Sequence, residues 1–373
     1  MRVALIHDHL AQAGGAEKVL QVLAEMFPQA TIFTLLYEPE NAAKYFAGRS
    51  IYTSIIQRLP WGVKHYKWYL PFMSLAVEFF NLSDYDLVIS DTSSFAKGVI
   101  TPDKAPHICY CHTPTRYLWS DTHSYIEDLP YNKLFKKLIA LSLQKIRLWD
   151  QAAAGRVDCF IANSHFIARR IYKYYKREST VIYPPVAIDQ FHLAAEVGDY
   201  FLAGGRLVPY KKFDLLIEAF RANGRQLKIF GDGPDEARLK KLAHGAGNIH
   251  FLGRVSETEK AELYARAQAF INPQEEDFGI TMVEALASGR PVIAYDSGGA
   301  REIVADGDTG LLFGEQNADS LNAALQRFYQ LRFSPERLRQ WAQNFSVEKF
   351  KELMSAKIAQ VLADYKKQLG PRN

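Results

Sequence analysis

Short apolar runs alternate with longer amphipathic segments along most of the chain. In the first half, runs rich in β-branched and aromatic residues predict strands over residues 3–7, 86–90, 107–111, 159–163 and 180–183. Apolar residues that recur with a helical period predict helices over residues 17–27, 134–154 and 165–174. Strands and helices that alternate in this way are typical of an α/β domain with a doubly wound parallel sheet.

The alternation stops at Tyr183-Pro184-Pro185 and restarts near residue 200. Further strands are predicted over residues 200–204, 226–230, 249–252, 269–271, 291–294 and 311–313, and helices over residues 213–222, 236–243 and 347–369. We therefore predict two Rossmann-like domains over residues 1–185 and 199–346, joined by a linker over residues 186–198. The two sheets are expected to face a cleft, and the C-terminal helix, in residues 347–373, is expected to cross back to the first domain.

Composition and length fit a two-domain soluble enzyme. The chain has 373 residues, of which 48% are hydrophobic and 23% charged. No apolar stretch approaches the ~20 residues of a membrane span, and the first apolar run is too short for a signal peptide. Cys109 and Cys111 point the same way from one strand, without further ligands at zinc-site spacing, so we expect buried thiols rather than a metal site. A reducing, cytoplasmic location follows.

The net charge of +4 arises in the first half of the chain, where residues 1–190 hold 21 basic against 17 acidic side chains. This excess is too small to indicate nucleic acid, but it is compatible with an anionic lipid surface. Two segments, residues 59–80 and 131–149, combine lysine or arginine with apolar and aromatic residues. Such segments are either interfacial membrane contacts or core helices with a solvated basic face.

Candidate chemistry lies where strands end, because open parallel sheets bind ligands outside the carboxyl ends of their strands. The segment EDFGITMVE, residues 276–284, follows one predicted strand and begins a helix. Its two carboxylates, Glu276 and Glu284, suit hydrogen bonds to vicinal diols, and the amides of residues 278–281 are donors for a phosphate or a sugar hydroxyl. Alternatively, Glu276 is an exposed loop charge and Glu284 a solvated helix residue.

Two cations follow the strand that opens the second domain. Arg206 closes the strand and Lys211 precedes the next helix, which is what a diphosphate needs for binding and for leaving-group stabilisation. A basic surface loop is the alternative, and Lys212 fits that description. His112, directly after the strand at residues 107–111, is either a site residue or a structural histidine.

Two other motifs are weaker. Gly14 and Gly15 allow close backbone approach at the first strand-to-helix turn, although they do not form a dinucleotide fingerprint. Asp306 and Asp308 are spaced like a D-x-D metal motif, but they lie in a glycine-containing turn and we interpret them as turn residues.

Taken together, these motifs resemble glycosyltransferase family 4, whose members have the GT-B fold and retain the configuration at the transferred sugar carbon. The resemblance rests on GGAE (14–17), YCHTPTRYLW (110–119), Asn163-Ser164, YPP (183–185), GRLVPYKK (205–212), GDGPD (231–235), FLGRVS (251–256) and EEDFGITMVEA (275–285). Within the family, the chain is most similar to the WbaZ-like mannosyltransferases of bacterial polysaccharide assembly. The resemblance covers nearly the whole chain, and one small departure is Lys212, where many members carry glycine.

The resemblance implies a role for each matching residue. Arg206 and Lys211 would contact the donor diphosphate, Glu276 the donor sugar and Glu284 the ribose. The implied catalytic set is His112, Glu276, Arg206 and Lys211. The implied donor site comprises Gly15, Arg206, Lys211, Gly231, Arg254, Val255, Glu276, Phe278, Gly279, Ile280 and Glu284. The implied acceptor side contains Gly14, Gly15, Arg116 and Tyr117.

The resemblance also implies a transfer without a metal or another cofactor, in which the acceptor attacks on the face that the diphosphate leaves. Glu276 then positions the sugar, while a double displacement through Glu276 is the alternative. GDP-mannose is the first expected donor and a UDP-hexose the second. The expected acceptor is a glycan or a polyprenyl-linked glycan, reached by peripheral contact with an anionic membrane at its cytoplasmic face, with no nucleic acid involved.

Other functions remain compatible with the sequence. An epimerase or a phosphorylase would share the architecture, and a non-catalytic nucleotide-sugar-binding scaffold would share the motifs. A dehydrogenase is disfavoured because neither domain carries the dinucleotide fingerprint with its downstream acidic residue.

Overall fold

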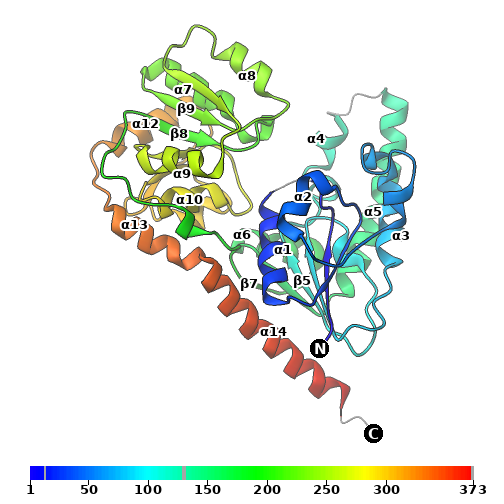
Figure 1. Cartoon of the computed structure of the whole chain (residues 1–373). Helices are drawn as coiled ribbons and strands as arrows, with labels where there is room; N and C mark the ends of the chain where they lie inside the picture. The colour runs from blue at the N-terminus through cyan, green and yellow to red at the C-terminus, as the bar shows by residue number, and fades with distance from the viewer. Residues whose placement is uncertain (12–13, 128–131, 371–373) are drawn as a thin grey trace. The chain divides into compact units, whose positions relative to one another are not determined.

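The computed structural model describes residues 1–11, 14–127 and 132–370 of the chain (Figure 1). It divides into two compact units, unit 1 with residues 1–183 and 350–373, and unit 2 with residues 184–349. Each unit is built on one parallel β-sheet with helices packed against it, which confirms the predicted pair of Rossmann-like domains.

The sheet of unit 1 has seven parallel strands in the order β3-β2-β1-β4-β5-β6-β7. The strands are β1 (Val3–His7), β2 (Thr31–Thr34), β3 (Ile51–Thr53), β4 (Leu87–Thr92), β5 (His107–Cys111), β6 (Cys159–Ala162) and β7 (Ser179–Val181). The sequence analysis did not predict β2 and β3, which are four and three residues long. The first strand lies inside the sheet, between β2 and β4, so the strand order reverses there.

Unit 1 also contains seven α-helices and several short 3₁₀ segments among the described residues. The α-helices are α1 (Gly15–Met26), α2 (Pro39–Phe46), α3 (Met73–Glu78), α4 (Thr122–Glu127), α5 (Lys133–Gly155), α6 (His165–Tyr175) and α14 (Val347–Leu369). The 3₁₀ segments are η1 (Ile55–Arg58), η2 (Tyr66–Phe72), η3 (Ala96–Gly98) and η4 (Arg116–Leu118). The segment of residues 59–80 is therefore mainly η2 and α3, a short and irregular structure.

The C-terminal helix α14 packs on unit 1, and Figure 1 shows it as one long helix that follows α13 in the chain. The ring of Phe350 lies 5.7 Å from the ring of Tyr110 on β5. Lys351 Nζ is 2.9 Å from Glu25 Oε2 on α1, and the hydroxyl of Tyr365 donates to the carbonyl of Asp103 at 3.0 Å. Unit 1 is thus completed by a helix from the far end of the sequence.

A buried carboxylate fastens the loop that follows β4. Asp8, at the end of β1, accepts hydrogen bonds from the amides of Ser93, Phe95 and Ala96, each 2.7 Å long, and from the hydroxyl of Thr92. These donors satisfy both carboxylate oxygens, which is required for a charged group that is 5% exposed. The ends of β1 and β4 are therefore held together by one side chain.

A second buried carboxylate, Asp150 on α5, joins several other segments. Its oxygens accept from the indole of Trp119 and the hydroxyl of Tyr175, both at 2.8 Å, and from Thr115 at 3.2 Å. Lys97 forms a buried ion pair with the same carboxylate. Loops after β4 and β5 and the helix α6 are thus tied to one point on α5.

The sheet of unit 2 has six parallel strands in the order β10-β9-β8-β11-β12-β13. Its strands are β8 (Phe201–Gly204), β9 (Leu227–Phe230), β10 (Ile249–Gly253), β11 (Phe270–Asn272), β12 (Val292–Tyr295) and β13 (Gly310–Phe313). The helices are α7 (Phe213–Asn223), α8 (Glu236–Leu242), α9 (Glu257–Arg266), α10 (Ile280–Ala287), α11 (Ala300–Ile303), α12 (Ala318–Phe328) and α13 (Pro335–Ala342). Here the order reverses between β8 and β11, again beside the first strand of the sheet.

Candidate functional site

The reversal in unit 2 brings two of the predicted site residues into contact. Lys211, in the loop after β8, and Glu276, in the loop after β11, form an ion pair with Nζ and Oε1 3.1 Å apart. The side chains are 14% and 18% exposed, and the amide of Gln274 donates to the same carboxylate oxygen at 2.7 Å. The alternative that Glu276 is a free loop charge is therefore wrong. A crevice outside the carboxyl ends of strands is where open α/β sheets bind their ligands.

Arg206 lies on the same loop as Lys211, two residues after the end of β8. Its side chain is exposed and forms no hydrogen bond or ion pair with any other described residue. A solvated guanidinium beside the end of a parallel strand is available for bidentate contact with phosphate oxygens. The loop thus carries Lys211, which is paired with a carboxylate, and Arg206, which has no such partner among the described residues.

Glycines allow the loops at this sheet edge to pass very close to one another. Gly231 has φ of 108°, and a Cβ there would lie 1.9 Å from the carbonyl oxygen of Gly205. Gly231 also donates to the carbonyl of Gly253 at 2.7 Å, which joins the ends of β9 and β10. Arg254 follows β10 and pairs with Asp232 while remaining largely exposed, and its neighbour Val255 is half-buried.

The N-terminus of α10 forms the other side of the site. Gly279 has φ of 110°, a left-handed conformation that favours glycine, and it immediately precedes the helix, which begins at Ile280. Phe278 is buried with its ring 5.6 Å from that of Phe345, so the turn is anchored in the core of unit 2. The helix start therefore presents backbone amides at a fixed position near Glu276.

Glu284 lies deeper than the sequence suggested. It is 3% exposed, and Lys260 on α9 lies with Nζ 3.1 Å from its carboxylate, so the alternative of a solvated helix residue is wrong. Lys260 also pairs with Glu257 at 2.7 Å. Burial alone would lower the pKa of Lys260, but the two carboxylates outweigh it and raise that pKa. Sequence reasoning missed Lys260, since nothing in its local pattern distinguishes it from a surface lysine.

In unit 1, the strand-order reversal brings together a row of buried ionisable side chains. His112 Nε2 lies 2.5 Å from Asp91 Oδ1, and His7 Nδ1 lies 2.9 Å from Asp91 Oδ2. The other ring nitrogen of His7 lies 3.8 Å from Glu17 in the first turn of α1. Sequence reasoning identified His112 but missed its partners, which come from three different elements.

The charges in this row stabilise one another. Burial alone would lower the pKa of His7, but contacts with Asp91 and Glu17 outweigh it and raise that pKa to about 10. Burial would raise the pKa of Asp91, yet His112 and His7 together hold it below its usual value. Asp91 is therefore a carboxylate shared by two imidazoles, which fixes the orientation of the His112 ring.

The glycine pair at the start of α1 makes room for this row. Gly14 has an extended backbone, with φ of −140°, and Gly15 is the first residue of the helix. A Cβ on Gly14 would lie 2.9 Å from a carboxylate oxygen of Glu17. Gly14 thus matters here because a larger residue would press against the carboxylate that contacts His7.

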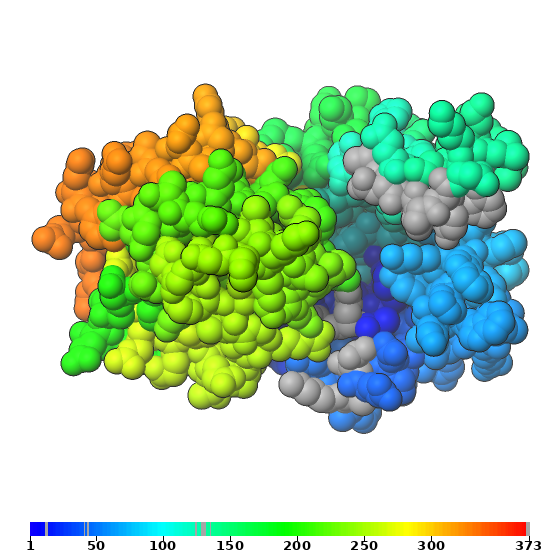
Figure 2. Space-filling view, turned by 90° about the horizontal axis from the view of Figure 1, so that it is seen from above, coloured from blue at the N-terminus to red at the C-terminus, as the bar shows by residue number. Residues whose placement is uncertain are grey.

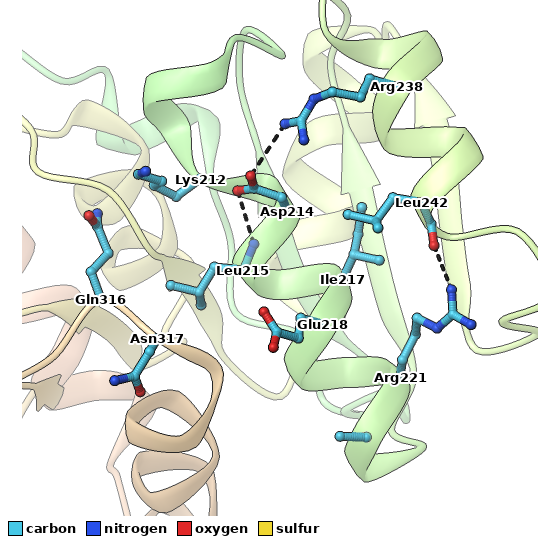
Figure 3. Close-up of a pocket in the computed structure, with 11 residues that line it drawn as sticks. Lys212, Asp214, Leu215, Ile217, Glu218, Arg221, Arg238, Leu242, Gln316 and Asn317 are labelled. Atoms are coloured by element: carbon cyan, nitrogen blue, oxygen red, sulfur yellow. Dashed lines mark hydrogen bonds and ion pairs between the residues drawn. The ribbon is translucent and has the colours of Figure 1, made fainter.

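Arg116 and Tyr117 begin η4, after β5, and line a hollow of about 310 Å³ at the carboxyl ends of β1, β4 and β5. A larger hollow of about 750 Å³ lies in unit 2 between α7, α8 and the start of α12 (Figure 3). Its lining includes the ion pair between Asp214 and Arg238, and it contains none of the predicted site residues. The volume of a hollow alone therefore does not identify the candidate active site.

The remaining sequence predictions concern groups outside the site. Cys109 and Cys111 are buried and unbonded, as expected of strand thiols. Asp306 and Asp308 flank Gly307 in a turn and pair with Arg327 and Arg337, which supports their interpretation as turn residues. Among the described residues, no helix is long and apolar enough to cross a membrane.

Two family models match the chain, one in each half. The model described as "Glycosyltransferase Family 4" matches residues 13–190, and the model described as "Glycosyl transferases group 1" matches residues 187–345. Together they cover Glu17, Asp91 and His112 of unit 1 and Lys211 and Glu276 of unit 2.

Several curated relatives are mannosyltransferases. The α-1,3/1,6-mannosyltransferase ALG2 of Dictyostelium discoideum is 25% identical over 302 residues, which is 67% of this chain and 68% of the relative. A GDP-mannose-dependent α-(1-6)-phosphatidylinositol monomannoside mannosyltransferase of Mycobacterium tuberculosis is 38% identical over 136 residues, 32% of this chain and 35% of the relative. The chain spans about half the length or less of most other curated relatives that it matches.

Solved structures share the fold over almost the entire chain. A sucrose-phosphate synthase from Thermosynechococcus elongatus has a TM-score of 0.74 at 17% identity, covering 98% of this chain and 100% of the other. The Anabaena protein HepE, solved in complex with UDP, has a TM-score of 0.68 at 18% identity, covering 96% and 100%. At such identities the likeness concerns the fold alone.

Lys212 provides a test of the local backbone. It has φ of 53° between Lys211 and α7, a left-handed conformation that disfavours a residue with a side chain by about 1 kcal/mol. We expect Lys212→Gly to raise the free energy of unfolding by about 0.5–1 kcal/mol, measured by denaturant titration. Lys212→Ala removes the same charge but keeps a Cβ, so it is the matched control. Equal stabilities of the two variants would contradict the assigned strain.

The raised pKa of His7 predicts a pH-dependent stability. Its contribution is fully present below the unfolded pKa of about 6.5 and is lost as the pH rises towards 10, because only the native state keeps the proton in that range. We expect the free energy of unfolding to fall between pH 6.5 and 9 by up to about 1.4 kcal/mol per pH unit. His7→Gln should flatten this slope, while His123→Gln, at an exposed position, should leave it unchanged. If the free energy of unfolding of His7→Gln kept the same pH dependence, the raised pKa of His7 would be contradicted.

Proposed function

Because the chain belongs to the family 4 glycosyltransferases of the GT-B fold, we propose that it transfers a hexose from a nucleotide-diphosphate sugar with retention of configuration. The observation that carries this proposal is the contact between Lys211 and Glu276 at the strand-order reversal of unit 2, beside Arg206, which has no hydrogen bond or ion pair to the described part of the chain. A cation for the leaving diphosphate and a carboxylate for the sugar are thereby held next to one another.

The mechanism follows from where charge develops. The sugar carbon becomes oxocarbenium-like while the diphosphate gains negative charge as it leaves. Arg206 and Lys211 stabilise that leaving group, and the amides at the start of α10 bind its oxygens or the sugar hydroxyls. When the diphosphate enters, it competes with Glu276 for Lys211, so the carboxylate becomes available to hydrogen-bond the sugar. Glu276 acts in this scheme as a positioning group, and the acceptor attacks on the face that the diphosphate leaves.

Unit 1 supplies His112 for the same reaction. Its ring is 12% exposed, and Asp91 contacts Nε2, so the opposite nitrogen and the ring edge are the parts left for a substrate. We assign to His112 a contact with the reacting sugar and to Asp91 the role of a positioning residue.

The donor we propose is GDP-mannose. Several relatives are mannosyltransferases, and the name of one states that it depends on GDP-mannose. A UDP-hexose is the second candidate, since HepE shares the fold and is solved with UDP-glucose. Glu284 would hold the ribose in either case, with Lys260 sharing its carboxylate. We propose that no metal is needed, because the cations of the β8 loop can neutralise a diphosphate directly.

We propose that the acceptor is a lipid-linked glycan reached from an anionic membrane surface. Large apolar side chains stand exposed on unit 1, namely Trp61, Trp68, Phe72, Leu75 and Phe79 in the first segment and Leu134, Leu138, Leu141 and Leu148 on α5. Figure 2 shows the first segment, in light blue, as part of the surface of unit 1. The helix α5 contacts η2, so the two exposed sets belong to neighbouring elements. Interspersed lysines complement anionic headgroups. Tyr131, at the start of the predicted second segment, lies outside the described residues.

Donor binding is testable by thermal unfolding with GDP-mannose or UDP-glucose, each with and without EDTA. A ligand at about 100 times its Kd stabilises the native state by ~2.7 kcal/mol, so the preferred donor should raise Tm by about 5 °C or more, with or without EDTA. The double variant Arg206→Ala/Lys211→Ala should lose the shift, while Lys212→Ala should keep it. No shift with either nucleotide sugar, or one that requires metal, would refute the proposed donor site. A shift without any transfer to acceptor would favour a non-catalytic scaffold.

Membrane contact is testable by vesicle flotation. We expect the chain to float with vesicles of phosphatidylglycerol and phosphatidylcholine, and less so at high salt or without the anionic lipid. Trp68→Ser/Phe79→Ser should reduce the bound fraction at least about tenfold, because burial of each aromatic side chain contributes roughly 1.5–3 kcal/mol. Leu242→Ser removes an exposed apolar residue from unit 2 and should have no effect. Equal flotation of all three proteins would contradict this surface.

A further inference from the structure

A hollow in unit 1 remains without an assigned ligand. It has a volume of about 310 Å³ and lies at the point where β1, β4 and β5 end, beside the residues that hold His112. Loops after these strands contribute Asp8, His9, Ser93, Ser94, Phe95, Thr113, Arg116 and Tyr117, while η2, α3 and α4 contribute Tyr66, Lys67, Leu70, Met73 and Tyr125. This is the sheet edge where an open parallel sheet binds a ligand.

The 3₁₀ geometry of η2 directs one row of side chains towards the hollow. A 3₁₀ helix has three residues per turn, so side chains at positions i and i+3 lie in one row. Lys67 and Leu70 form such a row with Met73, the first residue of α3, and all three line the hollow. Tyr66 lies outside the row and also lines the hollow. Trp68 and Phe72 lie outside that row, and each is 59% exposed. The same short segment therefore lines the hollow with one row and presents large apolar side chains to the outside.

The hollow combines positive charge with aromatic walls. Lys67 is exposed and forms no hydrogen bond or ion pair with any other described residue, and Arg116 is the second cation of the lining. Tyr117 and Tyr125 lie with their rings 5.4 Å apart, and Tyr66 lies at the same distance from His9. Flat aromatic side chains of this kind contact the apolar faces of sugar rings and isoprenoid chains.

Asp8, the acidic side chain of the lining, repels a bound anion only weakly. Both oxygens of Asp8 accept hydrogen bonds from the amides after β4 and from Thr92, so the carboxylate is compensated within the protein. His9 is half-buried, and desolvation lowers the pKa of its imidazole, which favours the neutral form with one donor nitrogen. The net character of the lining is therefore cationic, with the hydroxyl group of Ser93 as a further donor.

We propose that this hollow binds the acceptor through a phosphate attached to the acceptor sugar, with Lys67 and Arg116 on the phosphate and the tyrosines on the sugar. The isoprenoid part of such an acceptor would leave along η2, over Trp68 and Phe72. The proposal rests on the proposed function, since an acceptor is required only if the chain is a transferase. It deepens that function by assigning a phosphate-linked acceptor to the hollow, and by adding Lys67, which no sequence motif marked, to Arg116 and Tyr117.

The experiment measures binding to the full chain with saturating GDP present, so that the diphosphate site of unit 2 is occupied. The probes are farnesyl phosphate, farnesol and inorganic phosphate, followed by titration calorimetry or by tyrosine and tryptophan fluorescence. We expect farnesyl phosphate to bind at least tenfold more tightly than farnesol. We expect Lys67→Gln to weaken it at least fivefold and Lys67→Glu more strongly, while Lys64→Gln, at an exposed lysine outside the lining, changes it less than twofold.

The relative affinities of the three probes distinguish a lipid-linked phosphate from a free sugar phosphate as the ligand of the hollow. Farnesyl phosphate that binds much more tightly than inorganic phosphate supports a lipid source, whereas equal affinities support a free sugar phosphate in the same hollow. Equal affinities for farnesyl phosphate and farnesol, or no effect of either Lys67 substitution, would overturn the proposal. Because Lys67 is exposed, both variants should fold, and unchanged stabilisation by GDP-mannose verifies this. Failure of GDP-mannose to bind the wild type would instead count against the proposed function.

Discussion

The position of the first strand within each sheet is the constraint on which the rest of the molecule depends. Both sheets place this strand inside, with later strands on each side, so the order of strands reverses beside it. Connections from the two adjoining strands then leave towards opposite faces of the sheet, and a crevice opens outside their carboxyl ends. In unit 1 this crevice adjoins the row from His112 to Glu17, and in unit 2 it holds Lys211 and Glu276. The chemistry of each unit is thus a consequence of its strand order.

The two units stabilise their charged groups differently. In unit 1, Asp8 and Asp150 are each satisfied by several donors from separate segments, and removing one member of such a buried set is expected to destabilise by about 3–5 kcal/mol. In unit 2, Lys211 and Glu276 are partly exposed and hold one another, while Arg206 has no partner among the described residues. Unit 1 therefore offers a prearranged surface, and unit 2 offers side chains that can exchange partners when an anion binds.

Sequence patterns predicted the parts that depend on local order. Runs such as residues 107–111 match strand β5 at both ends, and the helix at residues 347–369 matches α14. The rule that ligands lie at strand ends was enough to select Lys211 and Glu276 as candidates, because it needs only the positions of the strands along the chain. Their contact became visible only in the structure, through the order of the strands. The partners of His112 could not be found in this way, since His7 and Asp91 are 84 positions apart and meet only through strand pairing. Lys260 and Lys67 were not predicted as site residues for a similar reason. The burial of Lys260 depends on tertiary packing, and the position of Lys67 in a row of side chains depends on the 3₁₀ geometry of η2.

The placement of α14 has a consequence for synthesis on the ribosome. Proteins emerge from the N-terminus, and domains generally fold as they are completed. Unit 1, however, includes a helix translated only after all of unit 2, so the surface of Tyr110 and Glu25 stays uncovered while the intervening residues emerge. During that interval the nascent first sheet exposes apolar surface that Phe350 later covers. Unit 1 is therefore the first unit to begin folding and the last to be completed. Its incomplete form, without α14, is the form that most needs protection by chaperones.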